Sequence, residues 1–249
     1  MKRPSLTILI PTKDEKGNIE PMVRRMPDFG TVVELLFVDG HSKDGTLDEL
    51  KRVAAMYPDL NINCFIQEGK GKRAAVWQGF ERSRGDIVLI LDGDITVPPE
   101  EVVEAYRILA DAPSVFLNAT RFSFPMEKGA MQLPNYLANR FFSLLVSFII
   151  GKRLSDSLCG TKGMWKKEFL RLRDEAFLSN IDLFGDHELI FGAWHLGMDF
   201  VEYPVHYKAR LYGEAKIANQ KFSGGSAFLR IDLAALRHKF FGGKRTGGN

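Results

Sequence analysis

The chain has 249 residues and a formal net charge of +3, with 45 % apolar and 26 % charged residues, the composition of an ordinary globular protein. This small net charge gives no argument for nucleic-acid binding, and two cysteines, Cys64 and Cys159, do not suggest a disulfide framework. No apolar run reaches the ~18 to 20 residues that a membrane-spanning helix needs, so we expect a protein of the reducing cytoplasm.

The first half of the chain alternates between strand and helix patterns. Strands are expected at 6–11, 33–40, 62–67 and 86–94, and helices at 19–26, 42–58, 71–83 and 99–111. Asp44 or Thr46 would cap the second of these helices. Its inner face is expected to be formed by Leu47, Leu50, Val53 and Ala54. Repeated βα units predict an α/β fold, with a Rossmann-like, mostly parallel central sheet and helices on both of its faces.

The second half is less regular, with a strand expected at 115–122 and a helix at 133–154 that opens near Pro134. The inner face of this helix is expected to be formed by Phe141, Leu144, Leu145, Phe148 and Ile149. Arg140, Lys152 and Arg153 flank it, so it fits an amphipathic helix in a membrane interface about as well as a core helix. The stretch 226–245 raises the same alternatives.

Polar clusters follow three of the expected strands, at Thr12 to Glu15, Asp39 to Asp44 and Asp92 to Asp94. The carboxyl ends of parallel strands meet at one edge of a sheet, where ligands of such folds bind, so we expect these clusters to converge. Asp92 and Asp94 flank Gly93, and two carboxylates this close repel each other unless they are solvated or share a cation.

Mg²⁺ or Mn²⁺ suits the pair Asp92 and Asp94, because these ions prefer oxygen ligands and commonly bind through one or two carboxylates plus substrate phosphates. The pattern therefore indicates a divalent ion that carries a diphosphate. The alternative is a polar loop in which Asp94 and Thr96 lie near the cap of the helix at 99–111.

Seven segments together resemble family 2 glycosyltransferases with the GT-A fold, and within that family the polyprenyl-phosphate (dolichol-phosphate) mannose and glucose synthases. The segments span about residues 6 to 217 and follow the family's order. They are "ILIPTKDE", "LLFVDGHSKDGT", "GKGKRAAVWQGF", "LDGD", "NATRF", "SDSLCGTKGMW" and "GDHELIFGAWHLGMDFVEYPVHYKARLYGEAKI". The resemblance implies a glycosyltransferase domain at 1–220, which a basic amphipathic segment at 221–249 would follow, with no transmembrane domain.

The resemblance also implies roles for individual residues. The nucleotide sugar would be bound by Pro11, Thr12, Glu15, Asp39, Lys72 and Asp92. Asp94 would coordinate the metal, with Asp92 beside it, and Asp186 would complete the metal shell. Arg121, Arg210 and Lys216 would meet phosphate groups of donor or acceptor. One departure is Gly40, where the family has a second Asp, followed by His41, so the base of the nucleotide stays open. His187, His195 and His206 are expected to be structural.

The leading hypothesis is an inverting transferase that moves a hexose from a nucleotide diphosphate sugar (GDP-mannose or UDP-glucose type) to a lipid phosphate, at the cytoplasmic face of a membrane. A second hypothesis keeps the donor but has a hydroxyl acceptor, which needs a general base, with Asp186, Glu188 or Asp156 as candidates. A silent nucleotide-binding domain is less expected because the Asp92–Asp94 pair is present. A nucleotidyltransferase would need a glycine-rich signature that "IPTKDEKGN" lacks.

Overall fold

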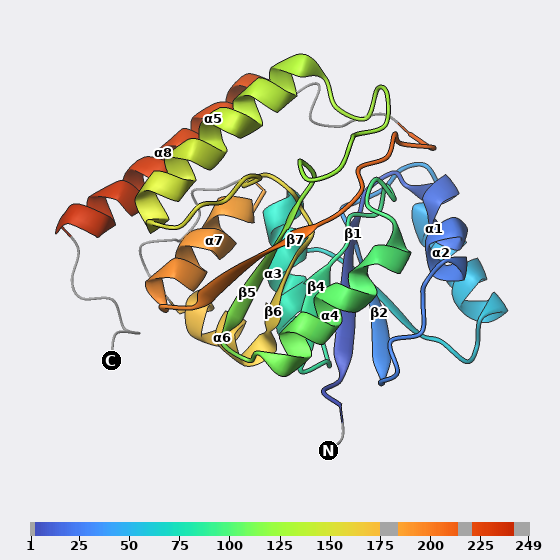
Figure 1. Cartoon of the computed structure of the whole chain (residues 1–249). Helices are drawn as coiled ribbons and strands as arrows, with labels where there is room; N and C mark the ends of the chain where they lie inside the picture. The colour runs from blue at the N-terminus through green and yellow to red at the C-terminus, as the bar shows by residue number, and fades with distance from the viewer. Residues whose placement is uncertain (1–2, 175–183, 214–220, 242–249) are drawn as a thin grey trace.

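A computed structural model describes residues 3–174, 184–213 and 221–241 (Figure 1). In this part of the chain, seven strands form one sheet in the order β3-β2-β1-β4-β6-β5-β7. The strands are β1 (Leu6–Thr12), β2 (Val33–Asp39), β3 (Asn61–Ile66), β4 (Ile87–Ile90), β5 (Val115–Thr120), β6 (Lys162–Trp165) and β7 (Asp199–Pro204). β6 runs antiparallel to β4 and β5, whereas the other neighbouring strands are parallel, so the predicted mostly parallel α/β sheet is confirmed.

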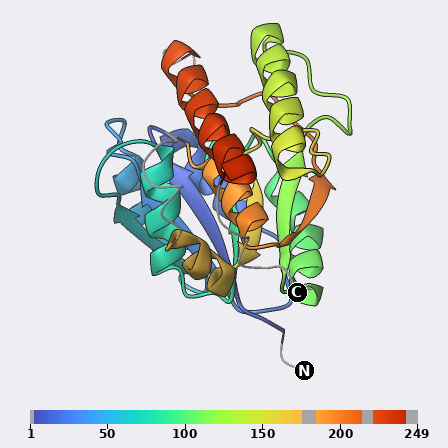
Figure 2. The ribbon, with the colours of Figure 1, turned by 90° about the vertical axis from the view of Figure 1, so that its left-hand side faces the viewer.

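Helices cover both faces of the sheet, as predicted. One face packs against α1 (Lys16–Arg24), α2 (Thr46–Met56) and the 3₁₀ turn η1 (Pro99–Glu101) with α4 (Val102–Asp111). The other packs against α3 (Lys72–Arg82), α5 (Leu133–Ile150), α6 (Lys166–Arg173), α7 (Asp186–His195) and α8 (Lys221–Phe241). α5 and α8 lie side by side (Figure 2).

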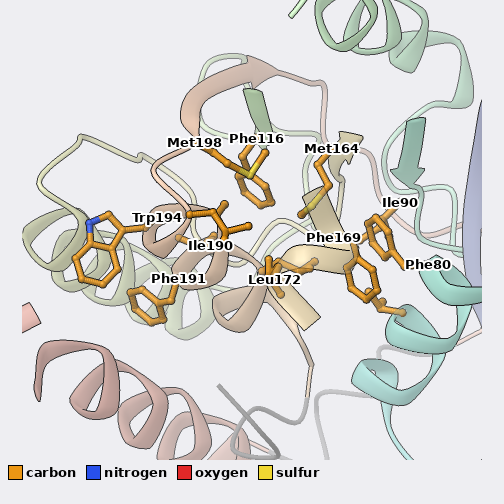
Figure 3. Close-up of a cluster of buried hydrophobic side chains, with 14 of the residues drawn as sticks. Phe80, Ile90, Phe116, Met164, Phe169, Leu172, Ile190, Phe191, Trp194 and Met198 are labelled. Carbon is orange, nitrogen blue, oxygen red and sulfur yellow. The ribbon is translucent and has the colours of Figure 1, made fainter. Parts of the chain in front are cut away.

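Alternation along the strands divides the core into two layers. In β1, the side chains of Ile8 and Ile10 join the cluster under α1, α2 and α4, whereas Leu9 joins the cluster on the opposite face. Figure 3 shows part of this second cluster, in which the rings of Phe80 and Phe169 stack with centroids 4.3 Å apart. All four residues of β4 are buried, so the chain emerges from the core directly into the Asp92–Asp94 loop.

The N-cap of α2 is Gly45, which makes no side-chain cap hydrogen bond, so the predicted cap by Asp44 or Thr46 is wrong by one position. The Oδ1 atom of Asp44 accepts the N–H of Thr46 at 3.0 Å, and α2 begins at Thr46. Leu50 and Val53 are buried on its inner face, and Leu47 and Ala54 are half-buried there. α1 begins at Lys16, three residues before the predicted start at Ile19.

The predicted inner face of α5 is confirmed for Ile149 and Leu145, which pack in the core, and is wrong for the other three residues. Phe141, Leu144 and Phe148 are 57 %, 69 % and 61 % exposed, so they lie on the outer face of the helix. The buried face instead carries Asn139, Phe142, Ser143, Val146, Ile149 and Ile150. The two polar residues can be buried there because both are hydrogen-bonded to the segment at 155–157.

α5 ends at Ile150, four residues before the predicted end at 154, yet it passes the length test for a membrane span that no apolar run was expected to pass. Its 18 residues are long and apolar enough to cross a membrane by length and composition, and 33 % of them are buried inside the protein. Length and composition alone do not separate a spanning helix from the core helix of a folded domain.

Candidate active site

The three polar clusters meet at the carboxyl edge of the sheet, as the sequence predicted. β1 lies between β2 and β4, and its last residue, Thr12, pairs in register with Asp39 at the end of β2. Leu9 of β1 pairs with Ile90, the last residue of β4, so the loop from Asp92 to Asp94 opens beside the end of β1. This edge therefore brings carboxylates from three strand ends together.

Asp39 has a carboxylate oxygen available for a ligand. The side chain is fully buried, and its Oδ2 accepts the N–H of Ser42 at 3.0 Å. Oδ1 is buried with no hydrogen-bond partner among the residues that the structure describes. A buried acceptor without a partner is costly, so Oδ1 is suited to a donor group from a bound molecule.

Gly40, the position at which the sequence departs from the expected second Asp, lies close to its neighbours. A Cβ atom at this position would lie 3.3 Å from the carbonyl oxygen of Thr12 and 3.5 Å from Oε1 of Gln67. Gln67 is buried at the end of β3, and its amide donates to the carbonyl of Gly71 at 3.1 Å. The side chain of Gln67, a neutral amide, thus lies near Gly40, where a second Asp was expected.

Asp92 forms an ion pair with Lys72, the first residue of α3, whose Nζ lies 2.6 Å from Oδ1. Burial alone would raise the pKa of Asp92, but the charge and hydrogen bond of Lys72, together with the charges of Lys162 and Arg121, hold that pKa below its usual value. Burial would likewise lower the pKa of Lys72, yet Asp92, Asp186 and Asp94 raise it above the ordinary value. Lys72 therefore interacts electrostatically with all three of these carboxylates.

Gly160 allows a second loop to close on this ion pair. A Cβ atom at Gly160 would lie 2.2 Å from Oδ2 of Asp92 and 2.3 Å from Nζ of Lys72. A side chain at this position would therefore have to displace the carboxylate of Asp92 or the ammonium of Lys72.

Asp94 sits in a strained turn and binds Arg210. Its Oδ1 accepts the N–H and the hydroxyl of Thr96, at 3.1 and 2.8 Å. Ile95, between them, has a φ of +56°, a conformation that β-branched residues rarely adopt. Oδ2 of Asp94 accepts Nη2 of Arg210 at 2.6 Å, and Nη1 of the same guanidinium donates to Oε1 of Glu15 at 2.9 Å. One cation thus bridges the carboxylates that follow β1 and β4.

Asp186 and Glu188 lie in the first turn of α7, and both are paired with cations. Nζ of the fully buried Lys162 is 3.2 Å from Oδ1 of Asp186 and also donates to the carbonyls of Ser157 and Cys159. Arg73 of α3 forms an ion pair with Glu188, whose side chain is completely buried. These pairs join α3, β6 and α7 beside the Asp92–Asp94 loop.

Arg121 is held by a buried carboxylate. Its Nε and Nη2 atoms donate to the two oxygens of Asp156 at 2.7 and 2.8 Å, and its guanidinium lies 4.9 Å from the ring of Tyr207. Asn139 of α5 donates to the same carboxylate at 2.7 Å. Burial alone would raise the pKa of Asp156, but Arg121 holds it below the usual value. A rigid, fixed cation therefore lies between the site and α5.

His187 of α7 is a buried structural residue, as expected. Its Nδ1 lies 2.7 Å from Oδ1 of Asp232 on α8, and its Nε2 lies 3.2 Å from the hydroxyl of Ser157. His195 pairs with His238 of α8, with 2.9 Å between ring nitrogens, and His206 pairs with Glu101. These contacts attach α8 to α7.

The carboxylates fit a metal that is shared with a ligand and do not form a closed protein cage. Within residues 3–174, 184–213 and 221–241, no three His, Cys, Asp or Glu side chains are grouped so that they could hold an ion by themselves. Asp186 is accordingly not gathered with Asp92 and Asp94 into one three-carboxylate group. Mg²⁺ commonly uses one or two carboxylates together with phosphate oxygens, which matches Asp92 and Asp94 at an open edge.

The structure thus brings most of the predicted residues to one edge. Pro11 and Thr12 end β1 there, next to Glu15, and Asp39, Lys72, Asp92, Asp94 and Arg210 surround the same opening. Lys216 lies outside the described residues. Lys162 and Asn139 are not among the predicted site residues. A polar residue within a mostly apolar helix is a signal for Asn139, whereas the segment "CGTKGMW" around Lys162 gives no such signal.

The comparison with protein families gives one match, to glycosyl transferase family 2, over residues 7–170. Among curated relatives, a dolichol-phosphate mannosyltransferase from Saccharomyces cerevisiae is 29 % identical over 123 residues, which are 47 % of this chain and 45 % of the relative. An undecaprenyl-phosphate 4-deoxy-4-formamido-L-arabinose transferase from Pseudomonas aeruginosa is 31 % identical over 101 residues, 39 % of this chain and 30 % of the relative. The matched stretches thus span less than half the length of these relatives.

Solved structures share the fold at low sequence identity. Glucosyl-3-phosphoglycerate synthase from Mycobacterium tuberculosis, in complex with Mn²⁺, UDP and phosphoglyceric acid, has a TM-score of 0.67 and 16 % identity, covering 94 % of this chain and 78 % of the other. The mannosyltransferase PcManGT from Pyrobaculum calidifontis, in complex with GDP-Man and Mn²⁺, has a TM-score of 0.61 and 19 % identity, covering 97 % and 72 %.

Proposed function

The chain belongs to glycosyl transferase family 2, and from that membership we propose that it is an inverting, metal-dependent transferase that moves a hexose from a nucleotide diphosphate sugar to a lipid phosphate such as polyprenyl phosphate. It has the GT-A fold, which it shares with its structural neighbours. The names of the curated relatives support a lipid-phosphate acceptor, and the nucleotide and Mn²⁺ in the neighbours' complexes support the donor class and the metal.

The observation that carries the proposal is the combination of an unpaired acceptor and paired carboxylates at one edge of the sheet. The free Oδ1 of Asp39 can accept a hydrogen bond from a base N–H or a ribose hydroxyl. Asp92 and Asp94 would hold the metal, which when bound supplies positive charge against the leaving diphosphate. Lys72 and Arg210 can donate charge-assisted hydrogen bonds to the same diphosphate.

The carboxylates that could act as a general base are all engaged by cations, which favours a phosphate acceptor. Asp156 is bound by Arg121, Asp186 by Lys162, and Glu188 by Arg73. A hydroxyl acceptor needs a base that is free to take its proton, whereas a phosphate is already anionic at neutral pH. In the proposed reaction an acceptor phosphate oxygen bonds to the anomeric carbon as the bond to the diphosphate breaks on the opposite face. An α-linked donor thereby gives a β-linked product.

The acceptor class is tested by comparing a polyprenyl phosphate with the matching dephosphorylated alcohol, using the same nucleotide sugar and metal. We expect transfer to the phosphate and a rate at least a hundredfold lower with the alcohol. Equal rates would reject the phosphate acceptor and favour a hydroxyl acceptor with Asp186 or Glu188 as its base.

We further propose that α5 lies on a membrane surface, where such an acceptor is found. An apolar stripe on its outer face consists of exposed residues at spacings of three and four: Leu133, Leu137, Phe141, Leu144 and Phe148. On α8, Leu229, Leu233, Phe240 and Phe241 are also exposed. An apolar surface of this extent is unusual for a protein that contacts only water.

The contacts of α5 favour an interfacial position over a spanning one. Its inner face is tied to the site through Asn139, which binds Asp156, and Ser143, which binds the N–H of Ser157. A spanning helix would have to break these bonds and expose the polar groups to lipid. Lys239 of α8 lies beside the stripe, since its Nζ donates to the carbonyl of Phe148 at 2.7 Å, and its charge suits the anionic lipids of a cytoplasmic leaflet.

Flotation with vesicles that contain anionic lipid tests this position. The protein is expected to float with the vesicles at low salt, and Leu144→Ser with Phe148→Ser should return it to the soluble fraction. Val32→Ser is the matched control, because Val32 is 63 % exposed and immediately precedes β2, outside α5 and α8. A protein that stays soluble at low salt would contradict the membrane position.

A further inference from the structure

The carboxylates assigned to the donor and the metal are neutralised by two side chains of the protein itself. Nζ of Lys72 lies 2.6 Å from Asp92, and the guanidinium of Arg210 lies 2.6 Å from Asp94 and 2.9 Å from Glu15. In this state the cations occupy oxygens that a divalent ion would need. A metal ion that arrives alone therefore meets a site whose negative charge is already compensated.

In these two ion pairs both partners are partly exposed, whereas each of the pairs Arg73–Glu188, Lys162–Asp186 and Arg121–Asp156 has one partner that is at most 1 % exposed. The side chains of Lys72 and Asp92 are 24 % and 31 % exposed, and those of Arg210 and Asp94 are 20 % and 16 % exposed. In contrast, Lys162 is 1 % exposed and is also bound to the carbonyls of Ser157 and Cys159. Lys72 and Arg210 can thus change partners in a way that Lys162 cannot.

The backbone that carries Arg210 is anchored on its N-terminal side, so a change of partner needs only side-chain rotation. The N–H of Lys208 donates to the carbonyl of Thr96 at 2.9 Å, and the N–H of Ala209 donates to Oε2 of Glu127 at 2.7 Å. Arg210 therefore stays next to the Asp94 loop whichever anion it binds.

We infer that Lys72 and Arg210 are exchangeable counter-ions that couple metal binding to donor binding, an inference that rests on the proposed function. Without donor, Lys72 is paired with Asp92, and Arg210 is shared by Asp94 and Glu15. When a nucleoside diphosphate enters with a metal ion, each cation turns to the diphosphate oxygens, and the released carboxylates turn to the metal. Guanidinium and ammonium groups bind phosphate oxygens strongly, so the exchange replaces each ion pair with another.

Ligand affinities should be reciprocally linked as a consequence. Each ligand provides what the other needs: the diphosphate draws the cations away from the carboxylates, and the metal compensates the charge that the diphosphate adds. By linkage, the factor by which a nucleoside diphosphate tightens metal binding equals the factor by which the metal tightens nucleotide binding. Metal alone should bind weakly.

The experiment measures Mn²⁺ binding to the full chain by electron paramagnetic resonance of the free ion, with and without saturating UDP or GDP. For the wild type we expect at least a tenfold tightening of Mn²⁺ binding by one of the two nucleotides. Lys72→Gln and Arg210→Gln should bind Mn²⁺ alone several-fold more tightly than the wild type, because a competing cation is gone. The tightening by nucleotide should shrink, because the diphosphate has lost a partner. Arg210→Lys, which keeps a cation, should restore part of the tightening of Mn²⁺ binding by nucleotide.

The two expected effects have opposite signs: the variants bind Mn²⁺ alone more tightly, and nucleotide tightens their Mn²⁺ binding less. This combination distinguishes the exchange of counter-ions from a loss of structure. A variant that is merely misfolded would bind metal more weakly with and without nucleotide, and its thermal unfolding would show the defect. Arg25→Gln, which breaks an ion pair with Glu100 on the surface, is the matched control and should change neither quantity. Nucleotide-dependent Mn²⁺ binding that Lys72→Gln and Arg210→Gln leave unchanged would overturn the exchange alone. No Mn²⁺ binding with either nucleotide would overturn both the exchange and the proposed metal site.

Discussion

Replacing Asp156 with alanine should destabilise the protein severely, because it leaves the guanidinium of Arg121 without its counter-ion. The Asp156 carboxylate is fully buried and accepts from Arg121, Asn139 and the N–H of Leu158, while the Arg121 side chain is 11 % exposed. Removing one partner of a buried ion pair costs about 3 to 5 kcal/mol. In a chain of this length that corresponds to a melting temperature lower by roughly 6 to 20 °C.

Urea denaturation followed by circular dichroism measures this loss, and a double-mutant cycle with Arg121→Met isolates the pair. The double variant should be more stable than the sum of the single effects predicts, because it buries no unpaired charge. Glu104→Ala is the control, since the Glu104–Arg107 pair is 56 % and 58 % exposed and should contribute at most about 1 kcal/mol. If Asp156→Ala lowers the free energy of unfolding by less than about 1 kcal/mol, the view that this carboxylate fixes Arg121 is refuted.

Three further predictions concern the site. Asp94→Ala should abolish transfer while the thermal unfolding stays within a few degrees of the wild type, and normal transfer by this variant would remove Asp94 from the site. Gly160→Ala should lower transfer at least tenfold, measured with saturating donor, because its Cβ would lie within 2.3 Å of the Asp92–Lys72 pair, and wild-type rates would show that the loop can shift. Iodoacetamide at pH 8 should label the exposed Cys64 but label Cys159 only after unfolding, because Cys159 is buried and burial raises the pKa of its thiol to about 11. Equal labelling of both cysteines, read by mass spectrometry, would show that the loop that carries Cys159 opens.

The first half of the fold followed from periodicity because its units are local. Each strand and its helix lie next to each other in the chain, and the parallel arrangement then places Glu15, Asp39 and Asp92 at one edge without further information. The carboxylates that follow these strands could therefore be located from sequence, whereas metal binding by Asp92 and Asp94 stays a prediction.

β6 could not be predicted, because four residues that include Lys162 carry no strand pattern. Its position is set by partners far away in the chain, since it inserts antiparallel between β4 and β5. Lys162 is buried there because Asp186, twenty-four residues later, compensates its charge. β7 was missed for a related reason, since its residues are mostly half-buried at the edge of the sheet.

The error in α5 came from treating polar residues as exposed. The helical period was correct, but Asn139 and Ser143 face the core, where Asp156 and Ser157 satisfy their hydrogen bonds. Their burial rotates the apolar residues Phe141, Leu144 and Phe148 outward, a rotation that only tertiary contacts reveal. The bridge that Arg210 forms between Glu15 and Asp94 is likewise invisible in sequence, since it joins residues 195 and 116 positions apart.

Transfer of a radiolabelled sugar from a panel of nucleotide diphosphate sugars to polyprenyl phosphate in anionic vesicles tests the central claim most directly. At least one donor should give a labelled lipid product, excess chelator should abolish its formation, and added Mg²⁺ or Mn²⁺ should restore it. Transfer that continues undiminished in excess chelator, or no labelled lipid with any donor, would contradict the account.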